Sequence, residues 1–334
     1  MLTIQLLLFT LGVMRLTERV DMNGLPLLTF CGVATTDAIA VVSRYPRADE
    51  RIVAEDIVFG GGGPAATAAV AAARQGMNTA FIGVVGDDES GDRIVEDLAG
   101  EGVDVSGIAR APGGSARSVV IIDGPRKTRA ISNRPGPAVD LSGNDAARQI
   151  FAASQWIHVD QHGWASVRSY LDSMPSAARP RFSVDAGNPI PGYTGHNTDL
   201  YSPTMPALKE RYGSESKSRT VTDMLRMALD DGAHLVAVTN GGEGAFLMGE
   251  DRQLVQAPVP QVQINSTLGA GDVFHGALLA ALVRYEHNDL GSLQEVLEFA
   301  TSVASLSCRG LDGRSAIPDS QEISAFLNLT FSHS

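Results

Sequence analysis

Short apolar runs alternate with longer helix-like runs along most of this chain, and this alternation restricts the possible folds more than any other feature. Pro64–Gln75 is rich in alanine and is expected to form a buried helix, whereas the apolar run Thr79–Val85 is expected to form a strand. Strands that alternate with helices form parallel sheets with helices on both faces. We therefore expect an α/β fold with a mostly parallel central sheet.

The same patterns predict the remaining elements. The expected strands are Leu27–Ala34, Ile39–Val42, Arg51–Phe59, Thr79–Val85, Trp156–Val159, Phe182–Asp185 and Leu235–Thr239. The expected helices are Pro64–Gln75, Ser90–Gly100, Ala146–Ala153, Val167–Met174, Val221–Asp230, Ala270–Tyr285, Leu293–Ser307 and Ser320–Leu329.

Two hairpin-like regions, at about 37–61 and 114–133, do not follow the strand–helix alternation. In the second, the turn Gly124-Pro125 joins Arg117–Asp123 to Thr128–Asn133. We expect the two regions to pair into a small separate sheet. Ligands of open α/β folds bind beyond the carboxyl ends of the strands, so a sheet placed there would act as a lid. Exposed sheet edges are usually protected, and we expect homodimerisation through the lid.

Residues 1–24 are expected to be a disordered extension of a domain that covers 25–330. Leu2–Val13 is apolar, but a transmembrane helix needs about 20 residues. The run also lacks the basic region and the cleavage site of a signal peptide. We therefore expect no membrane partner.

Charge and cysteine content exclude several classes of protein. With 26 Lys and Arg against 38 Asp and Glu, the net charge of −12 disfavours nucleic acid as a partner. Cys31 and Cys308 are too few for a disulfide framework, and no cluster of Cys or His has zinc-ligand spacing.

The segment Ser266–Phe274 carries the most specific chemical signal. Its small residues Gly269, Ala270 and Gly271 open a helix, where free backbone N–H groups and the helix dipole favour an anion such as phosphate. Asp272 would lie beside that phosphate and could accept a proton from an attacking hydroxyl. Taken alone, Asp272 could equally be a helix-capping residue.

Three other glycine-rich segments stand at predicted junctions. Gly60–Thr67 opens the alanine-rich helix, Gly83–Gly91 joins a strand to the next helix, and Thr239–Gly244 follows a late strand. Together the four segments indicate small-molecule sites lined by backbone. No P-loop sequence and no protein-kinase motifs occur.

From about Leu27 to Leu329 the sequence resembles the ribokinase-like PfkB carbohydrate kinases. The motifs Gly62-Gly63, Gly83–Gly91, Val238–Gly244 and Gly269–Asp272 occur in that family's order. The resemblance implies phosphoryl transfer from ATP, with Mg²⁺, to a sugar hydroxyl. Because ATP is the donor and no signal sequence is evident, we expect a cytoplasmic enzyme.

The resemblance also implies the roles of individual residues. Asp272 would be the catalytic base, and the amides of Gly269, Ala270 and Gly271 would form the anion hole for the transferring phosphoryl. The sugar would contact Asp37 and the backbone at Gly62 and Gly63, with Thr67 at a position where the family often has Asn. The nucleotide would lie near Thr239, Gly241, Gly244, Ala304 and Cys308.

Two departures from the family concern cations. Ser266 replaces an Asp that often helps to hold a monovalent cation, which argues against potassium activation. Thr204–Ala207 lacks both polar residues of the family's N-x-x-E motif, so we expect Mg²⁺ to be held mainly by nucleotide phosphates, water and other carboxylates such as Asp185.

Some segments are most similar to the sulfofructose kinases, which phosphorylate the 1-hydroxyl of a ketohexose that carries a sulfonate. They are Gly61–Arg74, Gly269–Leu278 and Gly313–Asp319. An anionic tail requires basic residues, and Arg51, Arg117, Arg129 and Arg134 fall in or beside the lid. Asn133 and Asp160 are expected to contact sugar hydroxyls. The alternatives are a kinase of a neutral sugar or nucleoside, a non-catalytic sugar sensor, and, on weaker grounds, a nucleotide-binding oxidoreductase.

Overall fold

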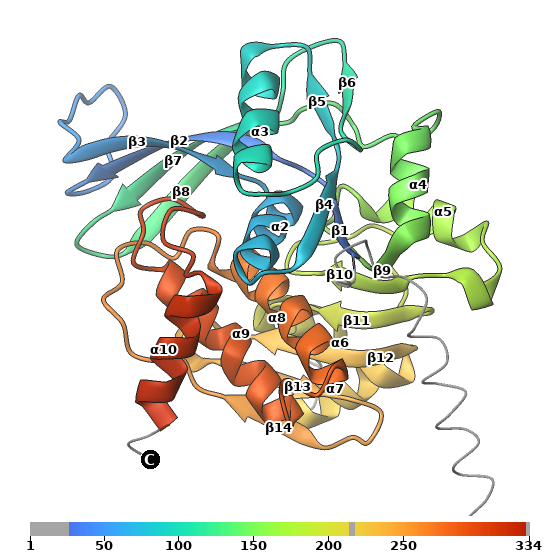
Figure 1. Ribbon diagram of the computed structural model, residues 1–334. Helices are drawn as coiled ribbons and strands as arrows, with labels where there is room; N and C mark the ends of the chain where they lie inside the picture. The colour runs from blue at the N-terminus through green and yellow to red at the C-terminus, as the bar shows by residue number, and fades with distance from the viewer. Residues whose placement is uncertain (1–26, 214–217, 332–334) are drawn as a thin grey trace, which may run out of the picture.

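The computed structural model describes residues 27–213 and 218–331, and its main feature is a large twisted sheet (Figure 1). The strand order is β14-β13-β12-β11-β10-β9-β1-β4. The strands β12 to β4 in this order run parallel, whereas β13 and β14 are antiparallel additions at one edge. In chain order the strands are β1 (Leu27–Cys31), β4 (Asn78–Ile82), β9 (Ser154–Val159), β10 (Arg181–Asp185), β11 (Thr198–Ser202), β12 (Ala233–Thr239), β13 (Ala245–Met248) and β14 (Leu254–Ala257).

Helices cover both faces of this sheet, and each face has its own apolar core. Leu28 and Phe30 of β1 point into one core, whereas Cys31 points into the other, as expected of alternating side chains in a strand. The first core is formed with α2 (Pro64–Arg74), α3 (Glu89–Gly100), α8 (Ala270–Glu286), α9 (Leu293–Ser307) and α10 (Ser320–Phe331). The second is formed with α4 (Asp145–Ala153), α5 (Trp164–Asp172), α6 (Met205–Tyr212) and α7 (Val221–Asp230).

The alanine content of α2 allows α8 to approach it closely. A Cβ atom added at Gly276 of α8 would lie 2.0 Å from the carbonyl oxygen of Ala68. Only glycine therefore fits at this contact, which fixes α8 and its amino-terminal end relative to α2.

A second sheet, the lid sheet, projects from one side of the molecule (Figure 1). Its order is β3-β2-β7-β8, formed by β2 (Thr35–Val42), β3 (Asp56–Gly62), β7 (Arg117–Asp123) and β8 (Thr128–Arg134). The predicted pairing of the two hairpin-like regions is therefore confirmed. Arg51, expected to open a strand, lies instead in the loop before β3.

Other sequence predictions need correction. The single strand expected at Thr79–Val85 is divided between β4 and the short β5 (Val84–Gly86), which pairs with β6 (Ala109–Ala111) outside the main sheet. The sequence analysis missed β11, α6, β13 and β14. The expected extension 1–24 lies outside the described residues. Within the described part of the chain, no helix is long and apolar enough to cross a membrane.

Candidate active site

The site is built around the amino-terminal end of α8. Gly269 precedes this helix in the left-handed conformation, with φ of 75°, and a Cβ atom there would lie 2.9 Å from Cα of Gly313. The first-turn amides of a helix have no partner in the helix itself, so those of Ala270 and Gly271 are suited to binding an anion. The predicted anion hole thus has the required backbone form, although its role remains a prediction.

Asp272 lies in the first turn of α8, where acidic groups surround it. Burial, together with the nearby carboxylates of Asp185 and Asp160, raises the pKa of Asp272 to about 7. His275 and Arg129 act in the opposite direction. A carboxyl group with a pKa near neutrality can take up a proton and release it at working pH, as a general base must.

One helical turn beyond Asp272, His275 faces Asp185 at the carboxyl end of β10. The two side chains are buried, and Nδ1 of His275 lies 3.4 Å from Oδ2 of Asp185. Burial alone would lower the pKa of His275, but Asp185 raises it above its ordinary value. Burial likewise opposes ionisation of Asp185, yet His275 lowers its pKa overall. The sequence analysis missed this pair.

The lid sheet presents a polar row toward the site. Register places Asp37 beside Gly60 and Ser118, and Ser118 beside Asn133, so the three side chains share one face. The apolar residues of that face pack with Leu268, directly before the anion hole. We call it the inner face.

Asp37 is buried at the base of that row. Oδ1 of Asp37 accepts a hydrogen bond of 2.8 Å from the Thr35 hydroxyl. Burial raises the pKa of Asp37, and hydrogen bonds from Thr35 and Ser118 partly offset this increase. A Cβ atom at Gly62 would lie 2.1 Å from Oδ2 of Asp37. Only glycine fits beside the carboxylate there.

The lid arginines separate into two groups. Arg117 is the register neighbour of Thr36, and Arg134 is the register neighbour of Arg117, so both lie on the face opposite Asp37, which we call the outer face. Arg117 pairs with Asp88 at 2.6 Å, and Arg134 donates to the Ser115 carbonyl oxygen. Both side chains are therefore engaged by other parts of the protein, on the face away from Asp37.

The other two arginines remain candidates. Arg129 lies on the inner face, where its Nη1 donates a 2.8 Å hydrogen bond to the Thr267 hydroxyl, two residues before Gly269. It thus lies beside the predicted anion hole. Arg51 is exposed, and among the described residues its side chain has no hydrogen-bond or ion-pair partner.

Two predicted sugar contacts are buried structural residues instead. Asp160 is 0% exposed, and its carboxylate accepts four backbone N–H bonds, from Val33, Ala65, His162 and Gly163. The hydroxyl of Thr67, which is 1% exposed, accepts a bond from Arg314. Both residues hold the chain around the site and have no surface for a ligand. Gly63 caps α2 with φ of 91°, and a Cβ atom there would lie 2.3 Å from the Val33 carbonyl oxygen.

The predicted nucleotide side lies around the carboxyl end of β12 and the end of α9. Thr239 ends β12, Gly241 and Gly244 follow with φ of 54° and 94°, and a Cβ atom at Gly244 would lie 2.1 Å from the Ala257 carbonyl oxygen. Cys308 caps α9, where its thiol donates to the Ala304 carbonyl oxygen at 3.3 Å. The Cys308 carbonyl accepts bonds from the amides of 265 and 266, which ties α9 to the loop before the anion hole.

The glycine-rich segment Gly83–Gly91 forms a junction between α3 and the lid, and the ligand site expected there stays a prediction. Its Asp88 caps α3 and also binds Ser115 and Arg117 at the start of the lid strand β7. Gly86 and Gly91 are needed for packing, because a Cβ atom at either would lie 2.3 Å from a backbone oxygen.

Divalent metal and ATP fit the donor groups that are present. The described residues contain no cluster of three His, Cys, Asp or Glu side chains that could hold a metal. Mg²⁺ commonly takes most of its ligands from phosphate oxygens and water, and it needs no such cluster. The first-turn amides at the start of α8, of which that of Ala270 also makes a long 3.4 Å contact with the Thr267 carbonyl oxygen, suit the phosphates that would accompany the metal.

Comparison with known proteins gives one consistent answer. Residues 26–179 and 197–320 match the pfkB family carbohydrate kinases. The chain is 24% identical over 304 residues to the ketohexokinase of Mus musculus, covering 84% of this chain and 96% of that protein. It is 27% identical over 304 residues to the fructokinase of Klebsiella pneumoniae, covering 84% and 94%. The fold matches that of Arabidopsis thaliana ribokinase complexed with ribose and ATP, with a TM-score of 0.76, 24% identity, and coverage of 91% of this chain and 99% of that one.

Proposed function

Because this chain belongs to the pfkB family of carbohydrate kinases and is an ATP-dependent sugar kinase, we propose that it phosphorylates the 1-hydroxyl of a ketohexose with an anionic tail. The proposed example is 6-deoxy-6-sulfofructose. The names of two relatives, ketohexokinase and fructokinase, support a ketohexose acceptor. The observation that carries the proposal is the row of Asp37, Ser118 and Asn133 on the lid face next to the anion hole.

In the proposed mechanism Asp272 takes the proton of the attacking hydroxyl as the anion hole receives the transferring phosphoryl. Asp37 and Asn133 hold the sugar hydroxyls, and the amides at Gly269–Gly271 stabilise negative charge that has left water. We assign Arg129 to the phosphoryl side, because its contact with Thr267 directs the guanidinium there. Mg²⁺, when bound, would neutralise part of the phosphate charge.

Arg51 is the proposed contact for the anionic tail. Its exposed side chain lies in the loop before β3 and makes no hydrogen bond or ion pair with the described residues. A guanidinium group binds sulfonate or phosphate oxygens through paired N–H donors. A neutral-sugar kinase would not require this contact.

The direct test measures ADP release with D-fructose, 6-deoxy-6-sulfofructose, fructose 6-phosphate and a nucleoside as separate acceptors. We expect the two anionic ketohexoses to give the highest kcat/KM. In the variant Arg51→Gln this preference should fall by about 10-fold or more, as for loss of a charged hydrogen bond. Arg126→Gln, at the β7–β8 turn and paired with Asp123, is the control. If D-fructose gives a kcat/KM as high as that of the two anionic ketohexoses, the neutral-sugar alternative is favoured.

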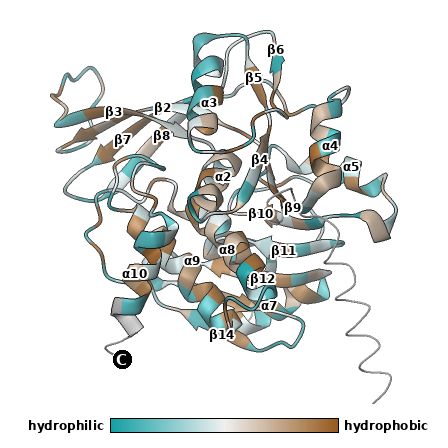
Figure 2. Cartoon of the chain, viewed as in Figure 1, coloured by the Kyte–Doolittle hydropathy of each residue, from teal (hydrophilic) through white to brown (hydrophobic). Residues whose placement is uncertain are grey.

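We propose that the protein forms a homodimer in which the outer face of the lid packs against a second copy of this chain. Phe59 and Val119 flank Ala38 there and are 64% and 52% exposed, and Ile57 is 59% exposed. Figure 2 shows the hydrophobic colour along β3 and β7. Because β3 and β8 are also sheet edges, pairing of two lids would protect edges and apolar surface together.

The use of ATP favours a cytoplasmic location for the enzyme.

A further inference from the structure

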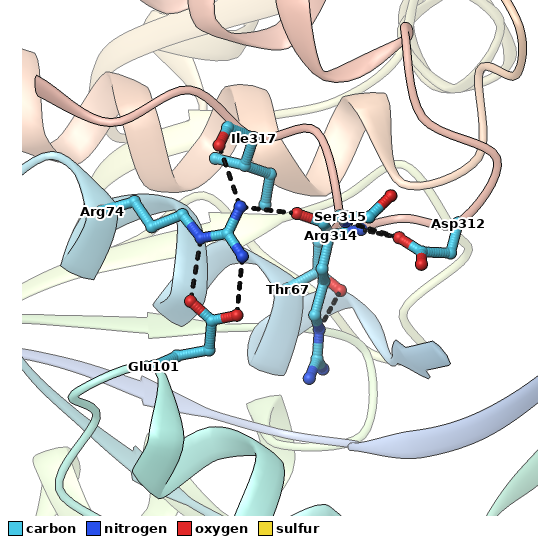
Figure 3. A network of polar contacts seen from close by, with 7 residues as sticks. All are labelled: Thr67, Arg74, Glu101, Asp312, Arg314, Ser315 and Ile317. Atoms are coloured by element: carbon cyan, nitrogen blue, oxygen red, sulfur yellow. Dashed lines mark hydrogen bonds and ion pairs between the residues drawn. The ribbon is translucent and has the colours of Figure 1, made fainter. Parts of the chain in front are cut away.

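The segment Asp312–Arg314 follows α9 and contacts both halves of the site. Although it lies in a loop, Arg314 is only 7% exposed. Its backbone amide and that of Ser315 both donate to Oδ1 of Asp312, at 2.8 and 2.6 Å, which fixes the turn (Figure 3).

The guanidinium of Arg314 lies behind the glycine end of β3. Its Nη2 donates a 2.6 Å hydrogen bond to the Gly62 carbonyl oxygen, and its Nε donates at 3.3 Å to the Thr67 hydroxyl. A Cβ atom added at Gly61 would lie 2.3 Å from Nη1 of Arg314. Since Gly61 points away from Asp37, the guanidinium contacts the outer face of β3.

Asp312 contacts the opposite face of the same strand. A Cβ atom added at Gly60 would lie 3.0 Å from Cβ and 3.1 Å from Oδ2 of Asp312. Gly60 is the register neighbour of Asp37 and shares its face. Asp312 and Arg314 therefore enclose the edge strand β3 from both sides, and we call Asp312–Arg314 the clasp.

The middle residue of the clasp contacts the anion hole. A Cβ atom at Gly269 would lie 2.9 Å from Cα of Gly313, so the two backbones are in direct contact. The clasp is also held by α2. Nη1 of Arg74 in this helix donates to the carbonyl oxygens of Arg314 and Ile317, at 2.8 and 2.9 Å. Arg74 is in turn held by two hydrogen bonds to Glu101 (Figure 3).

We propose that Arg314 is a positioning residue: through the clasp it fixes the sugar-binding end of β3 relative to the anion hole, and so places the acceptor hydroxyl for attack. Phosphoryl transfer depends mainly on positioning and charge, and a displacement of about 1 Å can cost about 100-fold in rate. The glycine run Gly60–Gly62 has no side chains of its own to restrain it. The clasp provides that restraint.

A buried guanidinium also suits this place electrostatically. Burial lowers the pKa of Arg314 to about 10, so the group stays charged at neutral pH. Its charge lowers the pKa of Asp37, whereas burial and the carboxylate of Asp312 raise it, and the pKa of Asp37 is raised overall.

The test compares Arg314→Met and Arg314→Lys with Arg309→Met, a control in the same segment whose side chain contacts Glu322 and Leu306 but not β3. Acceptor kinetics use D-fructose or 6-deoxy-6-sulfofructose, whichever has the higher kcat/KM. We expect Arg314→Met to lose about 10- to 100-fold in acceptor kcat/KM while the KM for ATP changes by less than about twofold. The ADP released per sugar phosphate should rise above one, because a misplaced sugar lets water compete.

A purely structural role would leave the acceptor KM and this ratio unchanged and lower only the amount of active enzyme, which would overturn the proposal. Arg314→Lys should recover part of the loss, and methylguanidinium added to Arg314→Ala should recover more than equal concentrations of urea or NaCl. No recovery by either route would also contradict a positioning role. Arg309→Met should match the unaltered enzyme in KM and ratio.

The inference rests on sugar-kinase activity, and it holds for any acceptor. If neither ketohexose is phosphorylated, the proposed substrate is wrong, and hydrogen exchange of the apo-protein then tests the clasp. Arg314→Met should accelerate exchange in both 60–63 and 268–271, and Arg309→Met should accelerate it in neither. Acceleration in 60–63 alone would show that the clasp does not couple the two halves.

Discussion

Nδ1 of His275 lies 3.4 Å from Oδ2 of Asp185, and this buried pair stands between the carboxyl end of β10 and the turn of α8 that carries Asp272. Two carboxyl groups close together disfavour ionisation of both, and a charged imidazole beside them reverses part of that effect. Burial is the largest cause of the raised pKa of Asp272, and the His275–Asp185 pair changes this pKa further.

Asp272→Asn is expected to reduce kcat by about 100-fold or more, because the amide cannot accept the proton of the sugar hydroxyl. The shape and the first-turn amides of α8 stay unchanged, so ATP affinity should be nearly unaltered. Steady-state kinetics and calorimetric titration with ATP measure the two effects. An Asn variant that keeps most of its activity would remove Asp272 from the role of base.

Activity should rise with pH through about 7. Burial and Asp185 raise the pKa of Asp272 to about 7, and only the ionised carboxylate can act as a base. His275→Gln removes a charge that lowers this pKa, so the acidic limb of the kcat/KM profile should move up by roughly one unit. His234→Gln, beside the surface carboxylate of Asp199, is the control and should leave the limb in place. An acidic limb that moves to lower pH in His275→Gln would contradict the proposed effect of His275 on the pKa of Asp272.

Asp272→Asn should also stabilise the protein at alkaline pH. The pKa of Asp272 is raised from 3.8 to about 7 in the folded state, so the folded chain holds a proton that the unfolded chain has lost. The resulting cost to stability grows between about pH 4 and pH 7 and is absent from the Asn variant. Urea unfolding at pH 8 should show a gain of about 1 kcal/mol or more, with a smaller gain at pH 5. An equal gain at both values would show that the titration of Asp272 is not its cause.

Gly61→Ala should reproduce the Arg314 variants without removing any charge. The added Cβ atom would lie 2.3 Å from Nη1 of Arg314 and must displace the guanidinium from Gly62. We expect about a 10-fold loss in acceptor kcat/KM with little change in the KM for ATP. The matched control is Gly100→Ala in α3, where nothing lies within 4 Å of the added atom. Kinetics like those of the control would mean that the contact at Gly61 is easily relieved.

Phe59→Ser should convert a dimer into a monomer if the outer face of the lid is the interface. Phe59 is 64% exposed in the single chain and would be covered in the dimer. Sedimentation or light scattering gives the mass in solution. The control is Leu254→Ser. Leu254 is an exposed apolar residue of β14, at the edge of the main sheet and outside the lid sheet, so this change should leave the mass unchanged. A monomeric unaltered protein would exclude the dimer outright.

Periodicity predicted the strand–helix alternation and the small separate sheet, and the resemblance carried by the glycine motifs predicted the family. The antiparallel strands β13 and β14 were missed because they are only four residues each. The strand expected at Thr79–Val85 is divided, because Gly83 allows the chain to leave the main sheet before β5. A Cβ atom there would lie 2.8 Å from the Gly32 carbonyl oxygen.

The residue types and the order of the motifs were sufficient, without a structure, to identify a sugar kinase and to select Asp272 and its anion hole. Only the tertiary structure separated Asp160 and Thr67, which are at most 1% exposed, from Asn133 and the 8% exposed Asp37, which lie on the inner face. The physical reason is that polar side chains look alike in a sequence, whereas burial and strand register determine whether they meet a ligand or the protein's own backbone. Arg314 acquires its proposed role in the same way, since its partners Gly62 and Thr67 lie about 250 residues earlier in the chain.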